Sequence, residues 1–165
     1  MIGIFFLAAC NEPAPQKPEL SKEDVEHLSQ EMNKWDATRQ KDEIDAYVKN
    51  RGWEMTETGT GLRYMYVKKG EGAPAKNGGA VLVAYKVFLL DGTLCYSSEQ
   101  DGPRTVRIGK DYVESGLHEA LQLMKVGDQM RFILPSHLAH GLTGDDDKIP
   151  PRSTVMYEIE LLKTE

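Results

Sequence analysis

The chain has 165 residues, of which 40% are hydrophobic and 28% are charged, and its formal net charge is -6. This length suits one globular domain with an extension and is too short for two full domains. The acidic balance, without a cluster of Lys and Arg, argues against a nucleic-acid-binding protein. The two cysteines are too few for a disulfide framework and have the wrong spacing for a zinc site.

The first ten residues have the pattern of an export signal. Residues 2–9 form an apolar run far shorter than the ~20 residues that span a bilayer, and small residues precede Cys10. LAAC resembles a bacterial lipobox, in which the cysteine takes a lipid and becomes the mature N-terminus. We therefore expect residues 1–10 to be a lipoprotein-type signal segment with lipidation at Cys10. The alternative is a buried N-terminal strand with a chance cysteine.

A spacer and a helix follow. Residues 11–20 are polar and rich in proline, which predicts an extended linker. Ser21 is a good N-cap for a helix, and a second apolar set around Ile44 either continues this helix or starts another before Gly52. The apolar positions of the first set recur at a/d-like spacing and are Val25, Leu28, Met32 and Trp35.

Residues 21–60 are thus expected to be an N-terminal helical extension. It would serve as a dimerisation or substrate-cradling arm, or it would simply fold onto its own domain. Two heptads are too few to favour a dimer. We expect a monomer, with a dimer through this helix as the alternative.

From Leu62 onward the pattern changes to short strands. Tyr85 lies in the middle of the longest apolar alternation, and Asp91-Gly92 predicts a tight hairpin turn after it. Predicted strands cover residues 62–67, 81–90, 93–96, 104–108, 129–134 and 154–162.

One amphipathic helix is predicted among these strands. Its apolar face consists of Leu117, Ala120, Leu121 and Met124, at i, i+3, i+4 and i+7. Gly116 and Gly127 bracket it. Because one short helix buries little alone, its apolar face requires a sheet to pack against. The sequence therefore predicts an α+β fold with five or six mostly antiparallel strands and one core helix.

Three segments together carry a family resemblance. VLVAYKVFLLDGTLCYSS, GKDYVESGLHEALQLMKVGDQMRFILPSHLAHG and IPPRSTVMYEIELLK resemble the FKBP-type peptidyl-prolyl isomerases in unbroken order over residues 61–165. The resemblance implies a domain over these residues with a strongly twisted antiparallel sheet wrapped around the helix.

The activity that this family implies is rotation about X–Pro peptide bonds, whose barrier near ~20 kcal/mol is high enough to limit folding. The amide loses its resonance in the twisted transition state, so a dry apolar pocket that holds the twisted bond favours it over the planar ground state. Aromatic walls and one or two hydrogen-bond donors suffice. The resemblance implies no cofactor, no metal and no nucleophile.

The resemblance also implies site residues, position by position. Tyr85 matches the pocket tyrosine of the long central strand, and Tyr157 matches a wall aromatic that is usually phenylalanine. Val113 matches the apolar residue before the helix, and the backbone N–H of Glu114 matches a substrate hydrogen-bond donor. Ile149 matches the loop residue that leans over the pocket.

Five positions depart from the family pattern. Cys95-Tyr96 stands where the family has phenylalanine and aspartate, and Arg104 stands at a position that is usually aromatic. Leu117 replaces the tryptophan that floors the pocket, and His140 replaces a tyrosine that bonds the substrate carbonyl. We assign catalytic roles to Tyr85, Tyr96, His140 and Tyr157, and substrate-binding roles to Cys95, Arg104, Val113, Glu114, Leu117 and Ile149.

Several of these residues also have packing interpretations. Tyr85, Tyr157 and Leu117 would serve equally as core residues, and Cys95 is more typical of a small buried packing residue than of a redox thiol. His137 and His140, followed by the acidic residues 145–147, would suggest a metal site. An HxxH motif in a loop is weak evidence for such a site, and acidic residues in a surface loop are usually solvated, so we expect no metal.

We therefore expect a peptidyl-prolyl cis-trans isomerase, or rotamase, that acts on proline-containing clients and assists the folding of exported proteins. It would be lipid-anchored in the bacterial cell envelope, facing the periplasm or the cell exterior, with no nucleic-acid partner. The five departures keep an alternative open, an FKBP-fold binding or chaperone module without significant turnover. A third hypothesis is a metal-loaded domain.

Overall fold

Residues 21–165 are described by the computed structural model of the chain. The signal segment, the lipidation site at Cys10 and the linker that we expect over residues 1–20 lie outside this range. The chain divides into two compact units, one that ends at Lys34 and one that runs from Trp35 to Glu165.

Strands dominate the second unit. The strands are β1 (Thr56–Glu57), β2 (Arg63–Lys68), β3 (Ala80–Leu89), β4 (Leu94–Ser97), β5 (Arg104–Arg107), β6 (Gln129–Leu134) and β7 (Val155–Thr164). The helices of the described residues are α1 (Lys22–Asn50), α2 (Ser98–Asp101), α3 (Ser115–Gln122) and the 3-10 turn η1 (Ser136–Leu138).

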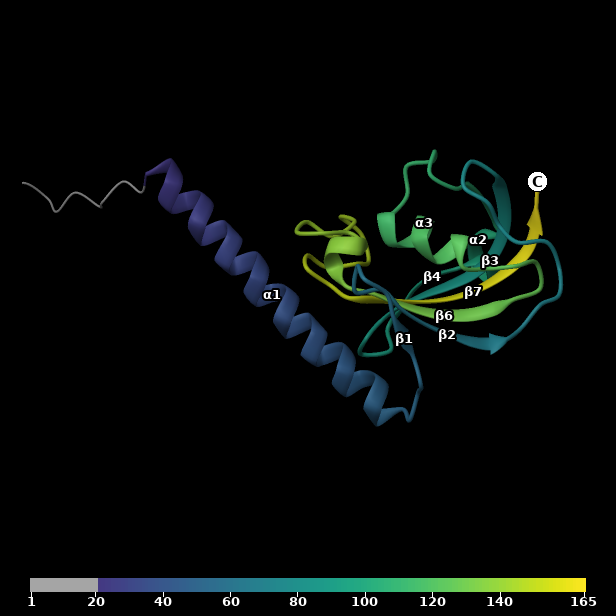
Figure 1. Cartoon of the computed structure of the whole chain (residues 1–165), viewed down its shortest axis with the longest axis horizontal. Helices are drawn as coiled ribbons and strands as arrows, with labels where there is room; N and C mark the ends of the chain where they lie inside the picture. Colours follow the sequence, from purple (N-terminus) through teal and green to yellow (C-terminus); the bar gives the residue numbers. More distant parts are fainter. Residues whose placement is uncertain (1–20) are drawn as a thin grey trace, which may run out of the picture. The chain divides into compact units, whose positions relative to one another are not determined.

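All strand pairs in the sheet are antiparallel, in the order β1-β2-β6-β7-β3-β4, and β5 also pairs with β3. The ten-residue β3 therefore has partners on both sides, with β7 along one edge and β4 and β5 along successive parts of the other. In Figure 1 the sheet curves and α3 lies inside the curve. This arrangement confirms the predicted α+β class and the sheet around one helix.

The core lies between α3 and the inner face of the sheet. Leu117, Ala120 and Leu121 of α3 are buried there, as the helical spacing predicted. Val81, Val83 and Val87 of β3 are each at most 3% exposed. On the opposite face of β3, Ala80 is buried, whereas Leu82, Ala84, Lys86 and Phe88 are only partly buried.

The hairpin predicted at Asp91-Gly92 joins β3 to β4. Gly92 has φ +93, a left-handed conformation that favours glycine. The Asp91 side chain accepts a hydrogen bond from Thr93 N–H at 2.8 Å. The two-residue strand β1 and the short α2 and η1 were not predicted because segments of this length carry no hydrophobic period.

Helix α1 is continuous, so the apolar set around Ile44 extends the first predicted helix rather than starting a second. Ile44 and Tyr47 form a second hydrophobic cluster with Ile133 of β6 and Met156 of β7. By contrast, the earlier apolar positions of the same helix are about half exposed or more, namely Val25, Leu28, Met32 and Trp35. Within residues 21–165, no helix has both the length and the apolar character that crossing a bilayer requires.

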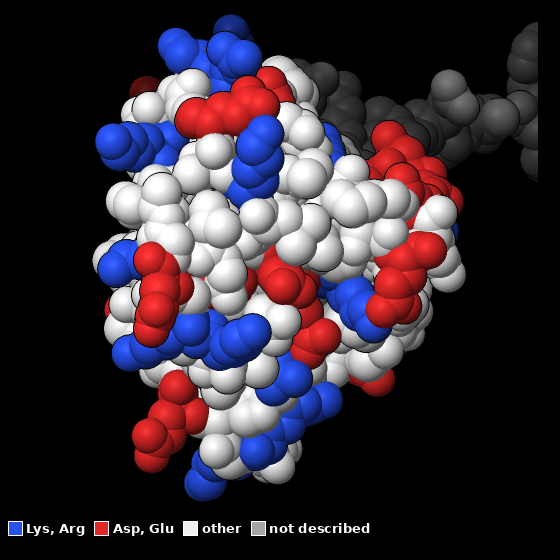
Figure 2. Space-filling model, turned by 90° about the vertical axis from the view of Figure 1, so that its right-hand side faces the viewer, with Lys and Arg blue, Asp and Glu red and all other residues white. Residues whose placement is uncertain are grey.

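Charged side chains are mixed in sign on the face that Figure 2 shows, where Lys and Arg stand among Asp and Glu. No broad patch of a single sign is visible on this face. Among the ion pairs of the described residues, Lys86 lies 2.7 Å from Glu99, and Arg131 of β6 lies 2.7 Å from Glu158 of β7. Exposed pairs of this kind contribute little to stability.

Candidate active site

A cavity of about 240 Å³ lies where the start of α3 meets β3, β4, β5, β7 and the connection between β6 and β7. Aliphatic side chains form much of its wall, because residues two apart on a strand point to the same face. The aliphatic wall consists of Val83, Val87, Val106, Leu117 and Ile159. The polar side chains of the wall are Tyr85, Tyr96, Arg104, Glu114, His140, Asp145 and Tyr157.

Strand pairing explains why the aromatic residues of the wall stand together. Tyr85 of β3 is opposite Ile159 of β7, and Val87 of β3 is opposite both Tyr157 of β7 and Tyr96 of β4. Side chains of directly opposed residues lie on one face at close separation. Three neighbouring strands thus direct three phenol groups to one cavity.

Close packing brings the start of α3 beside η1. A β-carbon on Gly116 would lie 2.8 Å from Leu134 Cδ2 and 2.8 Å from the carbonyl oxygen of Leu138. Only glycine allows this approach. The approach places Glu114, the N-cap residue of α3, near the loop that carries His140.

The Glu114 carboxylate is the centre of a polar network in the cavity wall. Its Oε1 accepts a hydrogen bond from the Tyr157 hydroxyl at 2.9 Å and lies 2.8 Å from Nε2 of His140. The Glu114 side chain makes no capping bond to its own helix. Within residues 21–165, no oxygen accepts a hydrogen bond from the Glu114 backbone N–H. This N–H is therefore free to donate to a ligand.

The environment keeps the wall phenols protonated. Burial, reinforced by the Glu114 carboxylate and its hydrogen bond, raises the pKa of Tyr157 well above its usual range. Burial and the negative charge of Asp101 also raise the pKa of Tyr85, against an opposing effect of Arg104. Both hydroxyls are therefore neutral donors at any physiological pH.

A second polar contact joins β4 to the β6–β7 connection. The Tyr96 hydroxyl donates a hydrogen bond to Asp145 Oδ2 and lies 3.2 Å from Asp147 Oδ2. Asp145 Oδ1 accepts from the backbone N–H groups of Ile149 at 2.7 Å and of Asp147 at 3.0 Å. Burial of Asp145 disfavours its charged form, but these hydrogen bonds outweigh burial and hold the pKa of the carboxyl below its usual value.

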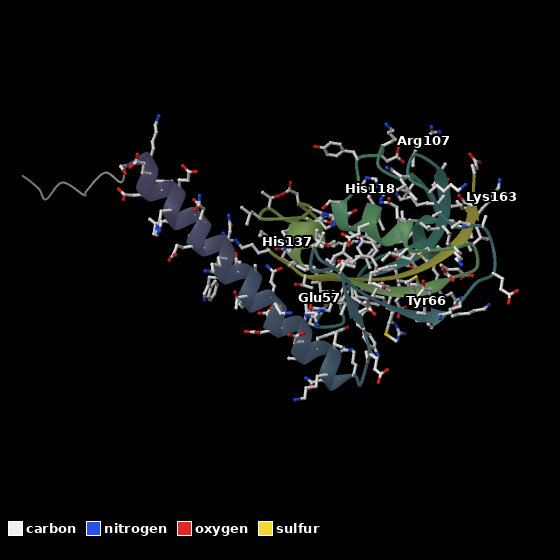
Figure 3. All side chains as sticks on the ribbon, in the orientation of Figure 1. Glu57, Tyr66, Arg107, His118, His137 and Lys163 are labelled. Carbon is white, nitrogen blue, oxygen red and sulfur yellow. The ribbon has the colours of Figure 1, made fainter. Side chains whose placement is uncertain are left out.

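A shallower hollow adjoins the cavity and shares Arg104, Glu114 and His140 with it. His118 of α3 contacts the segment between β5 and α3: its Nδ1 accepts from Gly109 N–H at 2.9 Å, and its Nε2 lies 3.1 Å from the Asp111 carbonyl oxygen. Figure 3 shows His118 on α3, beneath the segment that leads from Arg107 to this helix.

Seven of the ten pocket residues expected from the sequence line the cavity, namely Tyr85, Tyr96, Arg104, Glu114, Leu117, His140 and Tyr157. The other three do not. Cys95 is 2% exposed in the main core, and its Sγ lies 3.7 Å from the Lys148 carbonyl oxygen. Ile149 is also 2% exposed in that core, and Val113 lines the adjoining hollow. Burial raises the pKa of the Cys95 thiol, and Asp145 adds to this effect, so nothing activates it as a nucleophile.

Asp145 is the polar wall residue that the sequence reasoning missed. We interpreted the acidic run 145–147 as solvated surface charge, but Asp145 reaches the cavity and bonds Tyr96. A signal was present in the sequence. Tyr96 stands where the family has a carboxylate, and a phenol at that position requires an acceptor. Of the aliphatic wall residues only Leu117 was singled out, although Val83 and Val87 of β3 follow from the alternation around Tyr85.

The two histidines of the HxxH motif do not converge. His137 Nε2 lies 3.1 Å from the Thr60 carbonyl oxygen, whereas His140 contacts Glu114. Figure 3 shows His137 at η1, apart from His118. Among residues 21–165, no group of three or more His, Cys, Asp or Glu side chains is arranged to hold a metal ion.

Comparisons with known proteins agree with this architecture. The model of a family described as FKBP-type peptidyl-prolyl cis-trans isomerase matches residues 71–162. A probable FKBP-type peptidyl-prolyl cis-trans isomerase FkpA of Neisseria meningitidis serogroup B is 35% identical over 136 residues, which cover 81% of this chain and 49% of that protein. The FKBP-type 22 kDa peptidyl-prolyl cis-trans isomerase of Escherichia coli is 36% identical over 120 residues, covering 73% of this chain and 57% of that protein.

The chain therefore spans about half the length of these curated relatives. Among solved structures, the crystal structure of FkpA from Escherichia coli is similar with a TM-score of 0.66 and 29% sequence identity. This similarity covers 90% of the present chain and 75% of the other.

Proposed function

The chain belongs to the FKBP-type peptidyl-prolyl cis-trans isomerases, whose family model matches residues 71–162, and we propose that it catalyses rotation about X–Pro bonds of polypeptide clients. The observation that carries this proposal is the convergence of seven expected pocket residues on one cavity of about 240 Å³. Their chemical roles are part of the proposal.

The cavity supplies what the twisted amide needs. Aliphatic and aromatic walls exclude water from the prolyl ring, and a less hydrated amide loses its resonance more easily. A ligand carbonyl at the mouth requires a donor, and the backbone N–H of Glu114, which has no acceptor among residues 21–165, would supply it. Binding that is stronger for the twisted bond than for the planar one then lowers the barrier.

Three side-chain donors of the cavity wall already contact carboxylates. His140 Nε2 and the Tyr157 hydroxyl contact Glu114, and the Tyr96 hydroxyl donates to Asp145. We therefore assign the substrate carbonyl to Glu114 N–H. The side chains of His140, Tyr96 and Tyr157 shape and stiffen the wall, and Tyr85 and Leu117 contact the prolyl ring. Arg104 contacts the flanking residues of the client, together with Val113 in the adjoining hollow. Cys95 and Ile149 support the wall from the core.

We further propose that the isomerase domain acts on exported proteins in a bacterial cell envelope, at the periplasmic or outer surface. The lipobox-like LAAC supports a lipid anchor at Cys10, residues 11–20 would be the spacer, and residues 21–60 the helical extension before the domain over 61–165. A monomer is the proposed state. Labelling with a radioactive fatty acid tests the anchor. The native chain should be labelled and Cys10→Ser should not, and equal labelling of both would contradict it.

Refolding of a client tests the activity. A protein whose slow refolding phase is X–Pro isomerisation should refold faster with the full chain, in proportion to its concentration. An excess of unlabelled X–Pro peptide should compete and restore the slow phase. A slow phase that is unchanged at every concentration of the chain would contradict the proposal.

A binding module without significant turnover is the second candidate. The contacts of His140 and Tyr96 with carboxylates favour it, because these two side chains are then less available to a substrate carbonyl. This candidate predicts that the chain suppresses aggregation of an unfolded client without accelerating the proline-limited phase. Equal aggregation with and without the chain would exclude it.

A further inference from the structure

Two polar residues of α1 are buried although helix surfaces normally keep such groups in water. Asp36 is 6% and Gln40 is 2% exposed, and they lie one turn apart on the face that also buries Ile44. Both belong to the same compact unit as the sheet. Both lie outside the segment, residues 71–162, that matches the family model.

Gln40 binds the beginning of the β6–β7 connection, residues 135–154. Its Oε1 accepts from Ser136 N–H at 2.7 Å, and its Nε2 donates to Ser136 Oγ at 2.8 Å. Thr154, at the other end of the connection, has its Oγ1 3.5 Å from the same Oε1. One side-chain amide thus contacts both ends of the connection.

Asp36 binds the far end of the same connection. Its Oδ2 accepts a hydrogen bond from Nη1 of Arg152, with which it forms an ion pair. Arg152 has φ +58, a left-handed conformation that a side chain with a β-carbon disfavours. The ion pair with Asp36 compensates for this strain by holding Arg152 in place.

The two contacts meet at Gly141. Gly141 N–H donates to the Ser136 carbonyl at 2.8 Å, and the Gly141 carbonyl accepts from Arg152 N–H at 2.9 Å. His140 precedes Gly141 directly, and its Nε2 lies 2.8 Å from Glu114 in the cavity wall. A movement of Ser136 or Arg152 would therefore displace His140 through a single further hydrogen bond.

We propose that Asp36 and Gln40 are positioning residues that hold the β6–β7 connection in the geometry of the cavity wall. Neither touches the cavity, so they act through Ser136, Arg152 and Gly141. The functional domain accordingly extends back to the part of α1 that follows Lys34. This inference rests on the proposed isomerase function for its effect on activity, but the geometry that it predicts is measurable without activity.

The test uses the full chain with Gln40→Leu, Asp36→Asn and Gln40→Glu. Gln40→Leu removes both hydrogen bonds to Ser136 at similar side-chain size, whereas Gln40→Glu keeps the acceptor for Ser136 N–H. Asp42→Asn is the matched control for Asp36→Asn, because Asp42 is an exposed carboxylate of the same helix. The readouts are amide hydrogen exchange at Gly141 and Arg152, the NMR signals of the His140 ring, and kcat/KM on an X–Pro peptide.

We expect exchange at Gly141 and Arg152 to accelerate about tenfold in Asp36→Asn, the size that loss of one buried hydrogen bond gives, and at least as much in Gln40→Leu, which removes two. The amides of β3 should keep their native exchange rates, the His140 ring signals should shift, and kcat/KM should fall by a similar factor. Gln40→Glu should lie nearer to the native chain, and Asp42→Asn should match it.

Unchanged exchange at Gly141 in a folded variant would overturn the inference, as would a loss spread equally over β3. If Gln40→Leu does not fold, Asp36→Asn alone decides between these results. If the native chain has no isomerase activity, the proposed function fails, and exchange at Gly141 still decides whether α1 positions the connection.

Discussion

The hydrogen bond between Tyr157 and Glu114 provides a sharp test of the polar network in the cavity wall. Tyr157→Phe removes the hydroxyl and keeps the ring, which is 5% exposed between β7 and the cavity. Glu114 Oε1 then loses a donor at 2.9 Å and retains His140 at 2.8 Å. The substitution therefore isolates one hydrogen bond to a charged acceptor.

A hydrogen bond to a charged group contributes about 1.5–3 kcal/mol to the free energy of unfolding. The lower end applies here, because the Glu114 side chain is 13% exposed and water replaces part of the lost bond. About 1.5 kcal/mol corresponds to a decrease in Tm of roughly 3–6 °C for a chain of this size. Because the ring stays, kcat/KM on an X–Pro peptide should change by less than about tenfold.

Differential scanning calorimetry of the full chain at neutral pH measures the effect, with Tyr112→Phe as the matched control. Tyr112 is fully exposed, with a relative exposure of 106%, and loss of its hydroxyl should leave Tm unchanged. Equal Tm values for Tyr157→Phe and Tyr112→Phe would refute the hydrogen-bonded network in the wall.

Three further outcomes follow from the same site. Leu117→Trp should raise kcat/KM by about two- to tenfold, because an indole offers the prolyl ring a flat floor, and a decrease with unchanged Tm would contradict the place of Leu117 in the pocket. At about pH 10.5, absorbance at 295 nm should show fewer ionised tyrosines in the folded chain than in the unfolded chain. Equal absorbance would contradict the raised tyrosine pKa values. The tyrosines with a raised pKa are Tyr66, Tyr85, Tyr96 and Tyr157. The pKa of Asp145 is lowered in the folded chain, so its carboxylate stabilises the fold above the unfolded-state pKa of about 3.9, and this stabilisation is lost as the pH falls through the folded-state pKa. Asp145→Asn should therefore flatten the acid limb of the curve of stability against pH. A curve parallel to that of Asp42→Asn would contradict this.

The fold was largely predictable because its elements carry strong hydrophobic periods. The apolar face of α3 and the alternation along β3 and β7 are visible in the sequence, and each element forms within a few residues of its predicted range. The spacing of apolar residues did not predict which face of α1 is buried. The buried face there includes Asp36 and Gln40, and polar residues give no apolar signal when their partners lie about a hundred positions away.

Site residues on paired strands could be predicted from the sequence, whereas the site residue in the β6–β7 connection could not. Tyr85 and Tyr157 lie on paired strands, so their approach follows from register. Asp145 lies in the β6–β7 connection, whose path is set by tertiary contacts, and the sequence could not show that its carboxylate reaches Tyr96. Cys95 was expected at the pocket because it stands where the family has phenylalanine, but its smaller side chain is buried in the main core.

The central claim is that the cavity catalyses X–Pro rotation, and NMR exchange spectroscopy on a short apolar-X–Pro peptide tests it most directly. Uncatalysed exchange takes tens to hundreds of seconds. With a small amount of the full chain, the account predicts cis–trans exchange faster than in the peptide alone, accompanied by a shift of the Glu114 amide signal. An exchange rate equal to that of the peptide alone, at every concentration of the chain, would contradict it.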